Sequence, residues 1–245
     1  MNPAEPLTIV SLLPELLGTN GDAANARVLA QRARWAGADA RILDVRQAAD
    51  LPAQVDAVVI GSGTDAGLTA ARDILLTMAT ELREWSTAGV PILAVGTGWE
   101  LLSWGIELQD GSVIEGLGIV AGRAVPRAVR ATDDLVATSK YGRLLGFENH
   151  ARDYVGAEGS PLGRVVSGVG NGSGTEGLVM GDFFGTHLHG PVLARNPGLA
   201  DHILEVMFAR HGSSYTPGAR AAEVDDMAKA ARNQIAVRLG LATTE

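Results

Sequence analysis

Short apolar runs alternate with helical patterns through the first half of the chain. Runs typical of strands lie at residues 7–13, 40–45, 57–60 and 91–95. Between and after them, apolar residues recur at steps of three or four, the period of a helix with one buried face. This spacing predicts helices at residues 22–36, 67–88 and 99–104. Strands separated by helices of this length favour an α/β fold with a doubly wound, mostly parallel sheet flanked by helices.

The pattern changes from about Ile114 onward. Short apolar pairs stand between many glycines, which predicts smaller strands and long loops around residues 144–147, 164–169 and 177–184. Helices are expected again over residues 196–210 and 223–239. No internal repeat or low-complexity linker divides the chain. We therefore expect one domain over residues 1–245, with a helical C-terminal segment at about 220–241.

Composition excludes several classes of function. The chain has 245 residues, and its 28 acidic against 20 basic residues give a net charge of −8, which argues against a nucleic-acid surface. No apolar run is long enough to form a transmembrane segment and no basic segment leads into one at the N-terminus, so a cytoplasmic protein is expected. The chain contains no cysteine, which excludes disulfides, thiolate metal sites and thiol catalysis.

The turn after the fourth predicted strand is a candidate active-site position. Residues 92–100 (ILAVGTGWE) read as a strand, a glycine-bracketed turn and a helix. Such a turn at the carboxyl end of a strand can present a nucleophile, but the residue at its tip is Gly96, which has no side chain. Thr97 is a poor substitute, because the neighbour of such a tip normally points elsewhere. The other interpretation is a glycine that serves only a tight turn.

The segment at residues 185–191 (GTHLHGP) contains two histidines. His189 is expected at a strand end or in a loop, where an imidazole can act as general acid or base; a purely structural histidine is the alternative. His187 and His189 alternate, so in a strand they would share a face and could bind a metal ion. No third ligand has suitable spacing, and we predict no metal site.

Three further segments carry polar or glycine-rich patterns. Within residues 146–150 (GFENH), Glu148 and Asn149 are candidates for binding an amino-acid substrate and His150 for a subunit contact, with a simple turn as the alternative. Residues 61–65 (GSGTD) offer backbone N–H groups for an oxyanion or carboxylate pocket, or form an ordinary turn. Residues 168–177 lack the Gly-Lys-Ser/Thr ending of a phosphate loop, so a flexible loop beside the site is expected.

Taken in order, these segments resemble the class I glutamine amidotransferases of the CobB/CobQ type. Within that group they are most similar to the GatD-type glutaminase subunits of lipid II isoglutaminyl synthase. The resemblance covers most of the chain and rests on residues 13–21 (LPELLGTNG), 57–65 (AVVIGSGTD), 144–150 (LLGFENH), 161–177 and 185–197 (GTHLHGPVLARNP).

The resemblance implies a glutaminase in which a cysteine attacks the side-chain amide of glutamine. Ammonia would pass to a MurT-like Mur ligase in a heterodimer, which would use ATP to amidate D-glutamate in the peptidoglycan stem peptide. Carried over by position, His189 would be the catalytic histidine, while Gly61 and Gly63 would form the oxyanion turn. Arg127 would hold the glutamine carboxylate, with Arg123 or Arg130 as alternatives. ATP and Mg²⁺ are expected on the partner ligase and no cofactor in this subunit.

The chain departs from the family pattern at the nucleophile. Where the family has Cys-Gly-Gly-Tyr-Gln, residues 96–100 read Gly-Thr-Gly-Trp-Glu. A hydrogen atom cannot replace a thiolate, so glutaminase activity is expected to be impaired. Engineered inactivation would usually replace the cysteine alone. Here the positions of the family's tyrosine and glutamine also differ, as Trp99 and Glu100, which favours natural divergence. The alternatives are a catalytically dead homologue that scaffolds or regulates a Mur-ligase-like partner, and a cobyric-acid-synthase-like amidotransferase.

Overall fold

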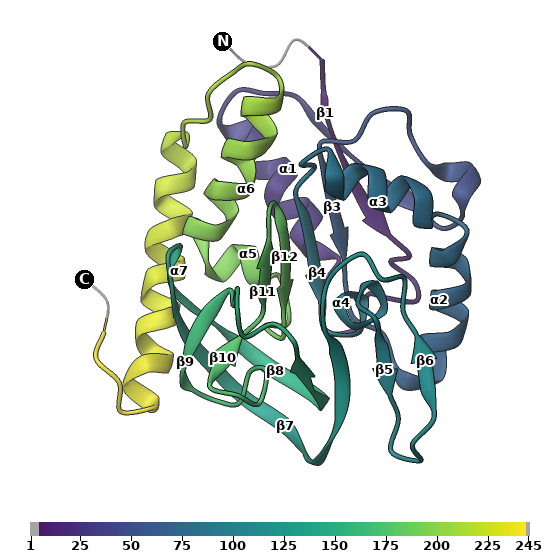
Figure 1. Ribbon diagram of the computed structural model, residues 1–245. Helices are drawn as coiled ribbons and strands as arrows, with labels where there is room; N and C mark the ends of the chain where they lie inside the picture. The colour runs from purple at the N-terminus through teal and green to yellow at the C-terminus, as the bar shows by residue number, and fades with distance from the viewer. Residues whose placement is uncertain (1–4, 244–245) are drawn as a thin grey trace.

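A six-stranded sheet forms the centre of the computed structural model, which describes residues 5–243 (Figure 1). Its strand order is β11-β12-β4-β3-β1-β2, and every neighbouring pair is parallel except β11 and β12. The strands are β1 (Leu7–Leu12), β2 (Ala40–Val45), β3 (Ala57–Ile60), β4 (Ile92–Val95), β11 (Leu178–Met180) and β12 (Phe183–Thr186). The mostly parallel, doubly wound sheet expected from the sequence is therefore confirmed.

Alternation of side chains along the buried strands creates two apolar cores, one on each face of the sheet. In β3, Val58 and Ile60 join the core under α2 and α3, whereas Ala57 and Val59 join the core under α1, α5 and α6. The outermost helix, α7, buries only three alanines. The helices are α1 (Ala24–Trp35), α2 (Leu68–Leu76), α3 (Ala79–Thr87), α4 (Thr97–Leu102), α5 (Val192–Arg195), α6 (Pro197–Arg210) and α7 (Ala219–Arg238).

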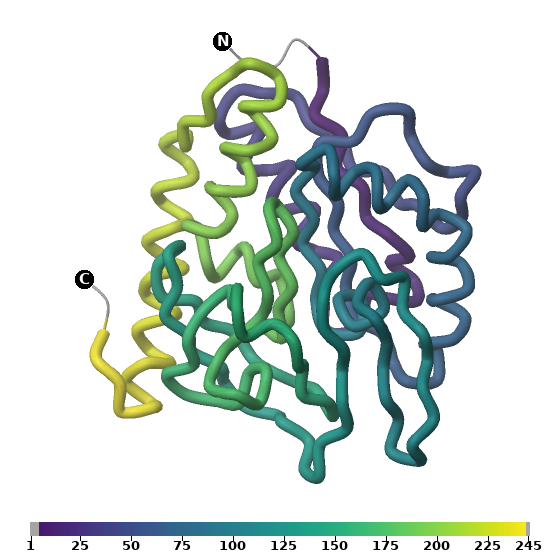
Figure 2. The backbone as a smooth tube through the Cα atoms, viewed as in Figure 1, coloured from purple at the N-terminus to yellow at the C-terminus, as the bar shows by residue number. Residues whose placement is uncertain are grey.

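A second sheet lies at the end of the molecule toward which the parallel strands run (Figures 1 and 2). Its order is β10-β9-β7-β5-β6, and β8 pairs with β7 along almost its whole length. Only β5 and β7 pair in parallel. The strands are β5 (Gly105–Glu107), β6 (Val113–Glu115), β7 (Arg123–Ser139), β8 (Gly142–Val155), β9 (Gly163–Ser167) and β10 (Thr175–Glu176).

The expectation of only small strands after residue 114 is wrong for β7 and β8, which have 17 and 14 residues. Both carry many charged residues because they are partly solvent-exposed, and this masked their strand pattern. The predicted helix at 67–88 is two helices, since the backbone breaks between Leu76 and Ala79. Within residues 5–243, no helix combines the length and apolar character needed to span a membrane.

Candidate functional site

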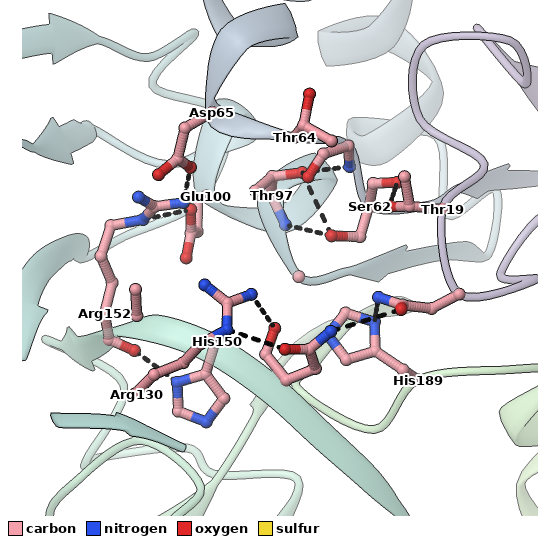
Figure 3. Close-up of a pocket in the computed structure, with 15 residues that line it drawn as sticks. Thr19, Ser62, Thr64, Asp65, Thr97, Glu100, Arg130, His150, Arg152 and His189 are labelled. Carbon is pink, nitrogen blue, oxygen red and sulfur yellow. Dashed lines mark hydrogen bonds and ion pairs between the residues drawn. The ribbon is translucent and has the colours of Figure 1, made fainter. Parts of the chain in front are cut away.

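A polar cavity of about 370 Å³ opens where the carboxyl ends of β3 and β4 meet strands β7 and β8 (Figure 3). The turns after β3 and β4 form one wall, and the middle of β8 forms the opposite one. Ligands of open α/β sheets bind at such carboxyl ends. The lining residues are Thr19, Asn20, Ser62, Gly63, Thr64, Asp65, Gly96, Thr97, Glu100, Arg130, Asn149, His150, Ala151, Arg152 and His189.

Gly96 forms the tip of the sharp turn between β4 and α4. Its backbone has φ 52° and ψ −123°, a strained conformation that matches the strand-turn-helix elbow on which nucleophiles are presented. A Cβ built at this position would lie 2.7 Å from Ser62 Oγ, 3.0 Å from Ser62 Cβ and 2.8 Å from His189 Cε1. The elbow is thus present, but the space for its side chain is occupied by two neighbouring residues.

Ser62 and Thr97 hydrogen-bond to each other beside the elbow (Figure 3). Their hydroxyl oxygens lie 3.3 Å apart, and the Thr97 backbone N–H donates to Ser62 Oγ at 3.4 Å. The Gly63 N–H donates to Thr97 Oγ1 at 2.6 Å. Backbone N–H groups in these turns are the ones available to stabilise an oxyanion. Those of Gly63 and Thr97 are already satisfied within the protein.

His189 faces the same point from the turn after β12. Its Nδ1 lies 3.2 Å from Asp22 Oδ2 and 3.3 Å from Asn20 Nδ2. We assign Nδ1 as the donor to the carboxylate, because a hydrogen bond to a charged acceptor is the stronger of the two. Nε2 is buried and has no hydrogen-bond partner. Asp22 also accepts the backbone N–H groups of Ser62 and Gly190, at 3.1 and 2.8 Å. The imidazole is therefore oriented by a buried acid, as in a catalytic histidine, with one nitrogen left as a free acceptor.

Charged groups line the part of the cavity farther from His189. Arg152 donates from Nε to Glu100 at 2.8 Å and from Nη2 to Asp65 at 2.9 Å. Burial lowers the pKa of Arg152, but the two carboxylates outweigh it and the net pKa is raised. Arg130, from β7, donates to the side chain and carbonyl of Asn149 at the cavity wall. Arg130 is thus the lining cation that is not paired with a carboxylate.

The structure brings only part of the predicted substrate set to the cavity. Gly63 and Asn149 line it, and so does Arg130, the alternative to Arg127. Arg127 instead pairs with Asp153, and Arg123 pairs with Glu107. Gly61 does not line the cavity, because it packs against the Leu17 carbonyl.

Glu148 is 1% exposed and lies outside the cavity lining. Its two carboxylate oxygens accept the backbone N–H groups of Val169 and Gly170, so it anchors the glycine-rich segment at residues 168–177. His150 is buried as well, with its ring nitrogens 3.1 Å from the Glu148 carboxylate and 2.6 Å from the Arg152 carbonyl. A subunit contact through the His150 ring is excluded by this burial.

His187 and His189 do not share a face, contrary to expectation. The strand β12 ends at Thr186, so both histidines lie in the turn beyond it. The His187 ring points into the core against Trp99 and His150, with centroid distances of 5.0 and 4.2 Å. Burial, followed by the neighbouring His150, lowers the pKa of His187. Among the described residues, no group of three or more His, Asp or Glu side chains is placed to hold a metal ion.

Three residues of the site escaped the sequence analysis. Asp22 was expected only as the start of a helix, Ser62 only as part of a glycine-rich turn, and Arg152 not at all. Asp22 and His189 are 167 positions apart, and Arg152 and Glu100 are 52 apart. No local pattern in the sequence indicates such pairings.

Trp99, at the position of the family's tyrosine, does not line the cavity. Its ring stacks on Tyr154 with the ring centroids 3.8 Å apart.

Comparison with known proteins agrees with this geometry. Residues 9–197 match the family model of the CobB/CobQ-like glutamine amidotransferase domain. The chain belongs to this family. A curated relative is 30% identical over 94% of this chain and 95% of its own: the lipid II isoglutaminyl synthase (glutamine-hydrolyzing) subunit GatD of Staphylococcus aureus (strain N315). The subunit of the same name from Streptococcus pneumoniae (strain ATCC BAA-255 / R6) is 29% identical, with coverage of 79% and 77%.

Solved structures support the amidotransferase fold. A crystal structure of a glutamine amidotransferase superposes with a TM-score of 0.57 at 20% identity, over 81% of this chain and 98% of that one. The structure of PurLQS from Thermotoga maritima gives a TM-score of 0.56 at 14% identity, with coverage of 85% and 100%. At these identities the likeness concerns the fold alone. The family resemblance deduced from the sequence motifs is therefore confirmed by the domain match and by the GatD relatives.

Proposed function

We propose that this chain is a GatD-type subunit that pairs with a MurT-like Mur ligase and does not itself release ammonia from glutamine. The observation that carries the proposal is Gly96 at the elbow, with its side-chain space occupied by Ser62 and His189. Cysteine is absent from the whole sequence, so the thioester route of the family has no nucleophile. The names of the two GatD relatives support peptidoglycan amidation as the process in which the complex works.

In this proposal the ligase carries the chemistry that needs a cofactor. ATP and Mg²⁺ bind to the partner, which activates the carboxylate of D-glutamate in the stem peptide, while this subunit uses no cofactor. The role of the subunit is then to scaffold or regulate the ligase from the cytoplasmic side. Its cavity retains polar groups suited to an amino acid, which supports regulation by a bound ligand. A cobyric-acid-type role would instead pair the chain with a different ligase, so the identity of the co-purifying ligase separates the two.

The test is ammonia release from glutamine by the chain co-purified with its ligase. We expect none from the unmodified chain. We also expect none from Gly96→Cys, because the new Cβ would meet Ser62 Cβ at 3.0 Å, which rotation of the serine hydroxyl does not relieve. The double variant Gly96→Cys/Ser62→Gly removes both serine contacts and leaves only the His189 Cε1 contact at 2.8 Å, so it should regain part of the activity. Ammonia release by the unmodified chain that is lost in His189→Ala would overturn the proposal.

Amino-acid binding to the cavity can be tested separately with glutamine as the probe in calorimetry. Arg130 lines the cavity, whereas Arg127 is paired with Asp153 outside it. Arg130→Ala should weaken glutamine binding at least tenfold, the equivalent of about 1.4 kcal/mol for a lost charge-assisted contact. Arg127→Ala is the matched control and should bind like the unmodified chain. Equal losses in both variants would contradict the assignment of Arg130 to the carboxylate.

A further inference from the structure

The proposed function gives the Ser62 hydroxyl a steric role only and no chemical one. Ser62 Oγ and His189 Cε1 lie 2.7 and 2.8 Å from the same point, the Cβ position of Gly96, so they face each other across the elbow. Both residues are buried and both line the cavity. The side chain missing from the elbow is thus replaced in space by a hydroxyl that enters from the neighbouring turn, after β3.

We propose that Ser62 is a nucleophile activated by His189 and Asp22, and that the cavity hydrolyses small carboxylic esters. This inference does not depend on the glutaminase question. The Thr97 backbone N–H donates to Ser62 Oγ at 3.4 Å, and Thr97 Oγ1 lies 3.3 Å from the same oxygen, where either hydroxyl can be the donor. The backbone donor stabilises negative charge on the serine oxygen and leaves its own proton free to be given away.

The acceptor for that proton is on the facing side. His189 Nε2 is buried and has no hydrogen-bond partner among residues 5–243, while Nδ1 is held by Asp22 at 3.2 Å; the residue as a whole belongs to the cavity lining. An unpartnered buried nitrogen is costly to maintain unless something binds there. Base and hydroxyl need not touch before substrate arrives, because such contacts are often long without substrate and tighten when it binds. The order of roles is therefore serine, histidine, aspartate, as in other hydrolases of unrelated fold.

The reaction balances with water as the only co-reactant. Ser62 Oγ attacks the ester carbonyl carbon and its proton passes to His189 Nε2. The bond between the carbonyl carbon and the alkoxy oxygen breaks, and the alcohol leaves with that proton. Water then attacks the acyl-serine, again giving a proton to His189, and the bond to Ser62 Oγ breaks as the serine takes the proton back. The products are a carboxylic acid and an alcohol.

The hydrogen bonding favours esters over amides as substrates. Because the Gly63 N–H already donates to Thr97 Oγ1 at 2.6 Å, it is not available to the oxyanion that forms on the substrate carbonyl. Loss of one such donor costs about 10²- to 10³-fold in rate. An alkoxide is a far better leaving group than an amide nitrogen, so only the ester tolerates this loss. The cavity of about 370 Å³ and its polar lining suit a small, polar acyl group.

A fluorophosphonate tests the nucleophile directly, because attack by serine displaces fluoride and leaves a stable phosphonyl group. With diisopropyl fluorophosphate and the full chain, we expect one added group by intact mass, located on the peptide that contains Ser62. Ser62→Ala should abolish the labelling. Loss of general-base assistance in His189→Gln should slow it at least about 100-fold. Ser173→Ala, which removes an exposed hydroxyl, should label like the unmodified chain.

Absence of a label on Ser62, or labelling that His189→Gln does not slow, overturns the inference. A second measurement uses the lack of native cysteines, since Ser62→Cys creates the only thiol in the chain. At pH 7, iodoacetamide should alkylate Cys at position 62 about tenfold faster with His189 present than in the Ser62→Cys/His189→Gln variant, because an adjacent imidazole promotes the thiolate. The Ser173→Cys pair, with and without His189→Gln, should show no difference.

The two proposals fail in different ways. Ammonia release from glutamine by the unmodified chain would refute the proposed function and leave the assignment of Ser62 to be decided by the label. Absence of a phosphonyl label on Ser62, or equal alkylation rates with and without His189, would refute the ester hydrolase and leave the non-hydrolysing GatD-type role intact.

Discussion

Two turns at the same edge of the sheet differ in the polar groups that they leave free. The turn after β4 holds Gly96, and its backbone N–H groups are already used: that of Gly96 donates to the Thr186 carbonyl and that of Thr97 to Ser62 Oγ. The turn after the neighbouring strand β12 still holds His189 against Asp22 with one nitrogen free. The first turn presents no side chain at its tip, whereas the second presents an imidazole oriented by a buried carboxylate.

The difference has a structural cause. Asp22 accepts backbone N–H groups from the turns at Ser62 and Gly190 as well as the histidine, so it ties three segments together. Its loss would leave buried donors unsatisfied, which proteins tolerate poorly. The histidine turn therefore has a structural role that does not depend on a thiol nucleophile, and the presence of His189 alone is weak evidence for glutaminase activity.

The largest expected effect comes from breaking the histidine turn. Asp22→Ala should lower the free energy of unfolding by about 4 kcal/mol, because it leaves three buried donors, the N–H groups of Ser62 and Gly190 and Nδ1 of His189, without their acceptor. Urea denaturation at pH 7 measures this. Asp22→Asn keeps an oxygen acceptor and should lose roughly half as much. A loss below about 1 kcal/mol in Asp22→Ala would contradict the structural role given to this carboxylate.

A smaller effect is expected at the elbow turn. Gly96→Ala should cost about 2 kcal/mol, since its Cβ would crowd Ser62 and His189 in a backbone conformation that disfavours side chains. Adding Ser62→Gly should recover part of that cost. A double-mutant cycle in urea gives the coupling between the two positions. Strictly additive effects would mean that Ser62 does not occupy the space of the elbow side chain.

The smallest effect is expected at the buried His187. Burial and His150 lower the pKa of His187 in the folded state, so this side chain contributes stability at pH values above the unfolded pKa of about 6.5. Below that value His187 is protonated in the unfolded chain but stays neutral in the folded chain, so the free energy of unfolding falls as the pH is lowered. Between pH 7 and 5 we expect His187→Gln to remove about 1 kcal/mol of this pH-dependent loss.

The control for that experiment is the exposed Ser173, whose side chain does not titrate in this range. Ser173→Ala should leave the pH dependence of the urea midpoint unchanged. If His187→Gln also leaves it unchanged, the His187 ring is protonated at the same pH in the folded and unfolded chains, and burial does not lower its pKa.

The sequence by itself determined the class of fold and part of the site. Apolar runs at β1, β3 and β4, separated by helical periods, leave few arrangements other than a parallel sheet covered on both faces. The glycine-bracketed turn at residue 96 and the histidine at 189 follow strands whose carboxyl ends meet, so their approach was predictable. The absence of cysteine needed no structure at all.

Only the tertiary structure decided which polar groups meet. Arg127 and Arg130 are equivalent in the sequence, but the register of β7 and β8 shifts between Pro126 and Ala131, and Arg130 lines the cavity. Asp22 and Ser62 reach the site from turns far from His189 in the chain. Local patterns report how each segment buries its apolar residues, whereas hydrogen bonds across 40 to 168 positions depend on how the segments pack.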